Sequence, residues 1–184
     1  MNRVYLDYNA SAPLREEARE AMVHAMALAG NPSSVHADGR QARAIVETAR
    51  QQVAAALGAQ GADVIFTSGA TEAAGLALKG RGIRCADIEH EAVSSWCQSD
   101  LSCDSDGGVA CEAPEATALQ LANSETGILQ QLPEGLALCD MTQAFGKLPV
   151  AFHWSGATMA LVSAHKIGGP KGVGALIVKS LSLI

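Results

Sequence analysis

The chain has 184 residues, of which 48% are hydrophobic and 17% charged, a composition typical of a globular protein with a buried core. Its formal net charge of -6 argues against non-specific binding to nucleic acid or to an anionic membrane. The sequence has neither a signal-peptide pattern nor an apolar run of about 18 residues, so we expect a cytoplasmic chain without a membrane span.

The first third of the chain predicts a short strand and two helices. The strand covers residues 4–6. The first helix covers 13–28, because Pro13 stands near its start and acidic residues occupy its first turn. After a Pro-containing turn at 30–34, apolar residues repeat at helical spacing as far as Leu57.

The rest of the chain predicts an α/β sheet. Strand 64–67 leads through a small-residue turn into a helix that ends near Leu78, the first half of a βαβ unit. Several strands are continuous apolar runs, which predicts a mostly parallel sheet with helices on both faces. We further expect a short helix at 91–97, mainly loop over 99–116, and strands at 83–87, 118–122, 137–140, 159–163 and 174–178.

The five cysteines show neither C-x-x-C spacing nor histidines at zinc-ligand spacing. Their odd number predicts reduced thiols, and small buried apolar side chains are the simplest interpretation of each. We therefore predict no metal site. The cysteines are Cys85, Cys97, Cys103, Cys111 and Cys139.

Two residues at predicted strand ends fit cofactor chemistry. Lys166 stands beside His165 after strand 159–163, where partial burial and nearby cations favour the free amine that forms a Schiff base. Asp140 ends strand 137–140, where a carboxylate can pair with a protonated pyridine nitrogen. A solvated lysine at a strand end and an aspartate that caps a turn explain the same residues.

Three polar turns accompany these two residues. The turn 68–71 precedes a helix and offers N–H groups and hydroxyls to a phosphate, although a plain helix cap fits as well. His90 lies between a strand and a helix, where it can stack on a cofactor ring or be a surface histidine flanked by acids. The segment 123–127 follows an apolar strand and suits either a hydrogen bond to a cofactor or an ordinary turn.

In their order and combination, these segments resemble the fold-type I pyridoxal 5'-phosphate (PLP) enzymes of the class V aminotransferase group, most of all the cysteine desulfurases. The resemblance implies the large α/β domain of those enzymes and PLP as the cofactor. It spans nearly the whole chain. The matching segments are 5–10, 30–36, 66–72, 89–93, 123–127, 143–149 and 163–174.

The resemblance implies a role for each candidate site residue. Lys166 and His90 would be catalytic: Lys166 would hold the cofactor covalently, and His90 would stack on its ring and move protons. Asp140 would pair with the pyridine nitrogen, and Gln143 with the phenolic oxygen. Ser124 stands where the family has the asparagine that contacts the cofactor, so a shorter side chain would have to make that contact, and Asn123 does not inherit the role. The phosphate would be held by Ala70, Thr71, Ser163 and His165.

The family pattern also sets expectations for the extent of the chain. We expect an N-terminal segment at 1–30 and an incomplete PLP-binding large domain at 31–184, with the small C-terminal domain absent. In the family, the sulfur-accepting cysteine, the arginine that binds the substrate carboxylate and the phosphate contact from the partner subunit lie beyond this region. The connections are short, and the 16 positions from Ser124 to Asp140 leave little room for a crossover helix.

By resemblance, the full reaction removes sulfur from L-cysteine and gives alanine and an enzyme persulfide. The expected setting is iron-sulfur cluster assembly by a homodimer with a sulfur-acceptor protein, and without nucleic acid, membrane or metal. Two alternatives stay open. One is a non-catalytic PLP-fold remnant or dimerisation partner. The other is a related class V lyase such as selenocysteine lyase, which the product formed from each substrate would identify.

Overall fold

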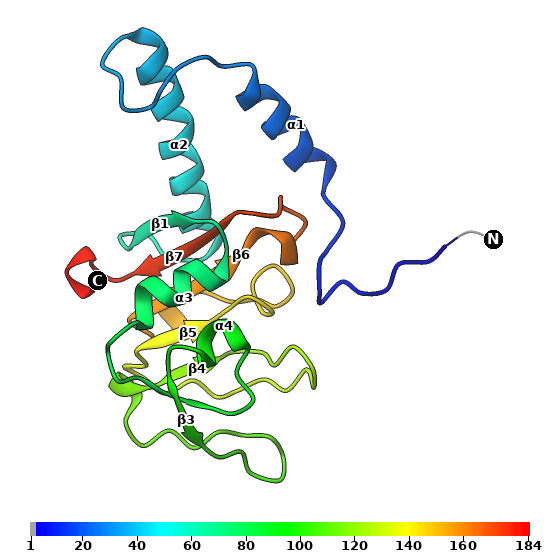
Figure 1. Cartoon of the computed structure of the whole chain (residues 1–184), viewed down its shortest axis with the longest axis vertical. Coiled ribbons are helices and arrows are strands. Elements are labelled where there is room, and N and C mark those ends of the chain that lie inside the picture. Colours follow the sequence, from blue (N-terminus) through cyan, green and yellow to red (C-terminus); the bar gives the residue numbers. More distant parts are fainter. Residues whose placement is uncertain (1–2) are drawn as a thin grey trace.

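The computed structural model describes residues 3–184, and its centre is a five-stranded sheet in the order β1-β7-β6-β5-β4 (Figure 1). Four of these strands run in one direction and β7 alone runs against them, since it pairs antiparallel with both β1 and β6. The prediction of a mostly parallel α/β sheet is confirmed. The strands are β1 (Asp63–Thr67), β4 (Ala118–Gln120), β5 (Leu138–Asp140), β6 (Met159–Ser163) and β7 (Gly174–Val178).

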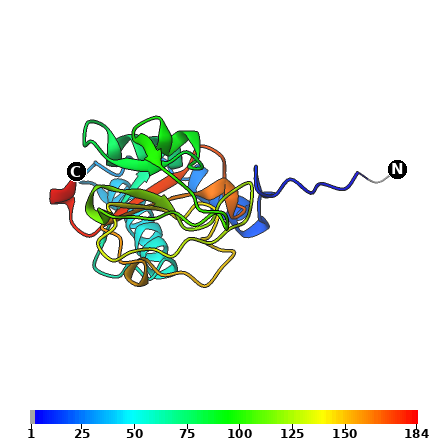
Figure 2. The same cartoon turned by 90° about the horizontal axis from the view of Figure 1, so that it is seen from below.

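Helices cover both faces of this sheet, as predicted. Seen from below (Figure 2), α3 (Ala70–Leu78) and α4 (Glu91–Ser94) lie on one side of the strands and α2 (Ala37–Ala56) on the other. Small side chains of α3 pack against one face, and Phe152 with Leu57 packs against the other. Short 3-10 turns complete the elements: η1 (Pro114–Ala116), η2 (Phe152–Trp154), η3 (Ala164–Lys166) and η4 (Leu181–Leu183).

The pairing of β1 corrects one expectation. The turn and helix after β1 predicted the first half of a βαβ unit, but β1 pairs antiparallel with β7, and the strand that follows α3 belongs to another sheet. That strand is β2 (Arg84–Ala86). The helix α3 therefore leads the chain to the two-stranded sheet next to β4 and does not complete a crossover beside β1.

A second, two-stranded parallel sheet contains the strand that the sequence did not predict. It joins β2 to β3 (Gln98–Leu101), inside the stretch expected to be mainly loop. β3 is polar and mostly exposed, so it forms by pairing with β2 and not by burying an apolar run. An isolated bridge from Arg84 to Thr117 continues this pair toward the edge strand β4.

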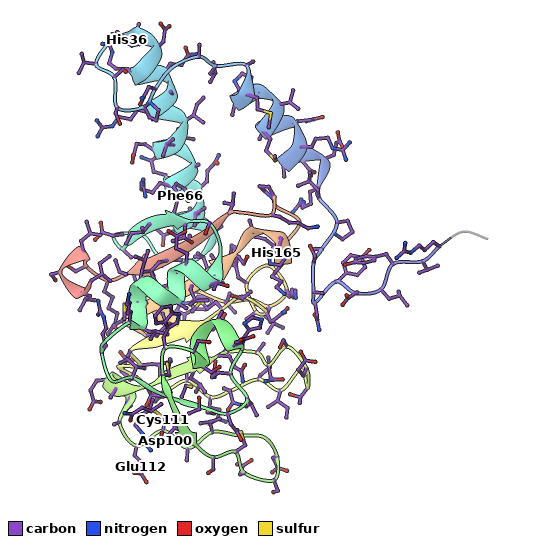
Figure 3. All side chains as sticks on the ribbon, in the orientation of Figure 1. His36, Phe66, Asp100, Cys111, Glu112 and His165 are labelled. Carbon is purple, nitrogen blue, oxygen red and sulfur yellow. The ribbon has the colours of Figure 1, made fainter. Side chains whose placement is uncertain are left out.

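The N-terminal part forms an arm that projects from the sheet (Figure 1). Its helix α1 (Glu16–Met26) lies within the predicted 13–28 and has no buried residue, while α2 ends near Leu57 as expected. The predicted strand at 4–6 is wrong: these residues are irregular, and Leu6 is 82% exposed, because no strand within residues 3–184 pairs with them. Figure 3 shows His36 at the tip of the arm, far from His165.

The connection from β4 to β5 contains no helix in the structure of residues 121–137. A bridge between Ala122 and Leu129 folds it into a loop, as the short spacing predicted. None of the helices among residues 3–184 has the length and apolar character needed to cross a membrane.

Candidate active site

The nine candidate site residues all line one cavity of about 490 Å³. The cavity lies where β1, β4, β5 and β6 end, because strands that run in one direction place their carboxyl ends at the same edge of the sheet. The structure thus brings together residues from five separate segments. They are Ala70, Thr71, His90, Ser124, Asp140, Gln143, Ser163, His165 and Lys166.

Asp140 is the buried anionic group of this cavity. It ends β5, is 9% exposed, and its Oδ1 accepts a hydrogen bond from the backbone N–H of Thr142 at 2.8 Å. Burial raises the pKa of this carboxyl above its ordinary value, while the hydrogen bonding of Thr142 and the charge of Lys166 oppose that rise. Among residues 3–184 no salt bridge to Asp140 forms. A cationic ligand atom would therefore find an unpaired carboxylate here.

Lys166 reaches the cavity from η3, directly after β6. Its Nζ donates hydrogen bonds to the backbone carbonyls of Asn9 at 2.6 Å and Ala10 at 3.1 Å. These carbonyls belong to the N-terminal segment, which therefore crosses the mouth of the cavity. The amine is held by neutral acceptors, so a covalent partner would not have to break an ion pair to reach it.

Asn9 is the centre of a polar cluster at this mouth. Its backbone carbonyl also accepts from Gln143 Nε2 at 3.0 Å, and its side-chain amide donates to the carbonyl of Ser124 at 3.2 Å. Lys147 donates to both Asn9 Oδ1 and Gln143 Oε1. Burial and the charge of Lys166 lower the pKa of the Lys147 amine. The cluster ties the N-terminal segment to both sides of the cavity.

Two histidines face the cavity in different states of hydrogen bonding. His90 precedes α4 and its Nδ1 accepts the N–H of Ala92 at 3.0 Å, which fixes the ring and leaves Nε2 available for a proton. His165 Nδ1 lies 3.4 Å from Ser11 Oγ. Burial, helped by the charges of Lys166 and Lys171, lowers the pKa of His165, so this ring is neutral at physiological pH.

The turn before α3 is the candidate phosphate site. Glu72 accepts the N–H of Ser68 at 2.6 Å, so the carboxylate caps the turn itself. The N–H groups of Ala70 and Thr71 stand in the first helical turn, where they have no intrahelical acceptor, and both residues line the cavity. Gly69 beside them has open space where a Cβ would stand. The N-cap residue of α3 is Gly69, without a side-chain cap hydrogen bond, so no Ser or Thr hydroxyl caps this helix as the plain-cap interpretation required. The N–H groups of Ala70 and Thr71 fit the phosphate interpretation.

Asn123 and Ser124 take different roles. Asn123 is 5% exposed, accepts the N–H groups of Glu125 and Thr126 at 2.9 Å each, and donates to the carbonyl of Ile88 at 3.1 Å. Its side chain thus holds the turn together. Ser124 lines the cavity, and its hydroxyl lies 3.3 Å from the Glu125 carboxylate.

Several cavity residues were missed by the sequence analysis. Gln120 and Thr142 each have a buried polar atom without a partner within residues 3–184, and both line the cavity. Their position at the ends of β4 and β5 was a usable signal, because the same argument singled out Asp140. Asn9 and Ala10 accept the hydrogen bonds of Lys166 through their backbone carbonyls. Every residue has such a carbonyl, so the residue type gives no signal for this contact. The other missed lining residues include Ser11, Lys171 and Gly172.

The chain matches the family described as "Aminotransferase class-V" over residues 4–99 and 110–183, and it belongs to that family. Within the family it is similar to cysteine desulfurases. It is 38% identical to the cysteine desulfurase of a Frankia species over 95% of this chain, and 36% identical to the putative cysteine desulfurase IscS 1 of Bacillus subtilis over 96%. It spans about half the length of these curated relatives, 52% and 56%.

Solved structures show the same fold. A NifS-like protein from Rickettsia africae superposes with a TM-score of 0.86 at 29% identity, covering 96% of this chain and 58% of that one. A structure described as SspA in complex with cysteine gives a TM-score of 0.84 at 27% identity, covering 96% and 61%. The large domain of fold-type I is thereby confirmed.

Proteins of this family depend on PLP, and the cavity fits that cofactor. A pyridine ring needs a carboxylate beside its nitrogen, an aldehyde needs a reachable amine, and a phosphate needs N–H donors. Asp140, Lys166 and the first turn of α3 supply these groups around one cavity. Gln120 and Thr142 also fit a bound ligand, because each has a buried polar atom without a partner among residues 3–184 that a ligand can satisfy.

Proposed function

We propose that this chain is the PLP-binding part of a cysteine desulfurase, with residues 31–184 as the cofactor-binding domain and 1–30 as an N-terminal segment. The observation that carries the proposal is the convergence of Lys166, Asp140 and the first turn of α3 on one cavity. The family membership and the similarity to cysteine desulfurases support it.

Each candidate residue has a task that its surroundings support. Lys166 anchors the cofactor and Asp140 keeps its ring nitrogen protonated. When bound, PLP supplies an electron sink for the carbon next to the amino group of the substrate. The imidazole of His90 is fixed through Nδ1 and carries a proton on Nε2. It stacks on the pyridine ring of the cofactor. Gln143 and Ser124 bind polar groups of the cofactor, and the phosphate is held by Ala70, Thr71, Ser163 and His165.

The proposed substrate is L-cysteine. Its carbon-sulfur bond breaks, the sulfur passes to a thiolate to form a persulfide, and the carbon takes up a proton to give alanine. None of the five cysteines lines the cavity within the part of the chain that the structure describes, and Cys85 and Cys139 are buried. The attacking thiolate therefore comes from outside residues 3–184. A sulfur-acceptor protein and a homodimer are part of the same proposal.

Cofactor binding tests the first half of the proposal. Titrating PLP into the chain should produce an absorbance band of covalently bound cofactor, and Lys166→Ala should abolish it. Lys179→Ala is the matched control, because this exposed lysine follows the far end of β7 and should keep the band. Equal bands in all three proteins, or none in any, would contradict the assigned lysine or the cofactor.

A second candidate function rests on the absence of a cysteine at the cavity of residues 3–184. In that case the chain binds PLP or a second copy without turning over cysteine. Sulfide release from L-cysteine in the presence of a thiol reductant separates the two. Turnover by the chain alone excludes the non-catalytic function, whereas a full cofactor band without turnover supports it.

A further inference from the structure

Glu89 is a buried carboxyl that the proposed function does not use. It lies in the turn between β2 and α4, is 7% exposed, and precedes His90. Its Oε1 accepts the backbone N–H of Gln120 at 2.8 Å, and its Oε2 is buried without any partner among the described residues. An ionised carboxylate in such a place would leave most of its lone pairs unsatisfied.

Glu89 is joined to the cavity through the lining residue Gln120. Gln120, its hydrogen-bond partner, is also the cross-strand neighbour of Asp140 in the β4-β5 register. Gln120 therefore links the two residues that carry these buried carboxyls. A negative charge on Asp140 disfavours a second negative charge on Glu89 and so raises the pKa of Glu89.

The partners of the two carboxyls decide which one keeps the proton. Asp140 accepts the N–H of Thr142, and the Lys166 cation lowers its pKa. Glu89 has one backbone N–H and no salt bridge within residues 3–184. The charges that act on the Glu89 pKa are those of Asp140 and Cys85, and both raise it. Glu89 in turn raises the pKa of Cys97, Cys103 and Cys139, and His90 follows it in the chain.

We propose that Glu89 is a positioning residue that holds the cavity residue Gln120 as a neutral carboxylic acid, which leaves Asp140 as the ionised carboxyl facing the cofactor. The part that concerns the cofactor rests on the proposed function. The neutral state of Glu89 rests on the surroundings of its own side chain. Consistent with this assignment, burial, with a smaller contribution from the charge of Asp140, raises the pKa of Glu89 to about 8 despite the hydrogen bond from Gln120.

A titration of the whole chain without added cofactor tests the neutral state directly. With glutamate labelled at its carboxyl carbon, carbon-13 NMR should show one resonance that titrates near pH 8, and Glu89→Gln should remove it. Exposed Glu112 is the control: Glu112→Gln should leave that resonance in place. If the Glu89 resonance titrates at about pH 4 to 5, the value of an ordinary glutamate, the proposal is overturned.

Cofactor binding tests the consequence for Asp140. Glu89→Gln should bind PLP at about pH 7 within about threefold of the unmodified chain, because the amide copies the neutral acid. A loss of about tenfold or more would show that a charge on Glu89 is needed, and would overturn the proposal. If the unmodified chain binds no PLP, the proposed function fails, and the titration still decides the state of Glu89.

Discussion

Gly174 is the position where a single methyl group should disturb the phosphate turn. It begins β7 and pairs with Thr67 of β1 and Ser163 of β6, the two strands that lead into the turn and into η3. A Cβ built on Gly174 would lie 2.6 Å from Gly69 Cα and 2.7 Å from its carbonyl carbon. It would also lie 2.9 Å from the carbonyl oxygen of Val162.

The size of the effect of Gly174→Ala follows from these distances. Carbon atoms pack best at about 3.5–4.0 Å, so the turn has to move by about 1 Å. All three neighbours are backbone atoms of two elements and cannot rotate away. Overpacking of this kind costs about 1–3 kcal/mol of unfolding free energy. With a urea slope of about 2 kcal/mol per molar, the denaturation midpoint should fall by about 0.5–1.5 M.

The same displacement should weaken cofactor binding, because Gly69 precedes the N–H groups of Ala70 and Thr71. A shift of about 1 Å in these donors should cost about tenfold in PLP affinity, near 1.4 kcal/mol. Gly75→Ala is the matched control: it adds one methyl group inside α3, where the nearest atom is a ring carbon of Trp96 at 3.3 Å. It should change stability by less than about 1 kcal/mol. Equal midpoints and affinities for both variants would refute the reasoning.

Three further predictions concern the carboxyls and the core. Because the pKa of Glu89 is raised from 4.5 to about 8, the folded chain holds a proton that the unfolded chain releases, so stability should fall as pH rises between these values, by about 5 kcal/mol at most. Glu89→Gln should remove this fall in urea titrations repeated across the pH range. Asp140→Asn, which replaces a buried charge by a neutral isostere, should keep or raise the stability of the cofactor-free chain in the same titrations. It should bind PLP at least about tenfold more weakly by absorbance. Phe152→Ala, in the core on the α2 face, should lower the unfolding free energy by about 3–5 kcal/mol in denaturant titrations.

The sheet could be predicted wherever a strand is buried on both faces. Residues 159–163 and 174–178 are continuous apolar runs, and β6 and β7 occupy those bounds with every residue buried. β3 carries no such signal, because its polar side chains are exposed and its pairing with β2 depends on tertiary contacts. The apolar residues at 4–6 suggested a strand, yet a strand needs a partner, and none within the described residues reaches them.

The cavity residues that stand at strand ends could be predicted from the sequence. Asp140 and Lys166 follow buried strands, and one topological rule places both at the same edge of the sheet. The contact of Lys166 with Asn9 lies beyond such reasoning, since it joins a side chain to a backbone carbonyl 157 positions away. Glu89 appeared in the sequence as one of two acids beside a surface histidine. Only the packing of β4 against its turn shows that it is buried.

The distribution of charge around the cavity explains why so acidic a chain can bind a phosphate ester. Lys166 and Lys171 line the cavity and are less buried than Asp140, so two cations lie nearer the solvent than the anionic floor that Asp140 forms. A ligand with a phosphate and a protonated ring nitrogen meets an opposite charge at both places, whereas inorganic phosphate leaves Asp140 unpaired. If Glu89 were ionised as well, the floor would carry two negative charges against one ring cation. The proton on Glu89 therefore leaves Asp140 as the one negative charge of the floor, which one pyridinium can balance.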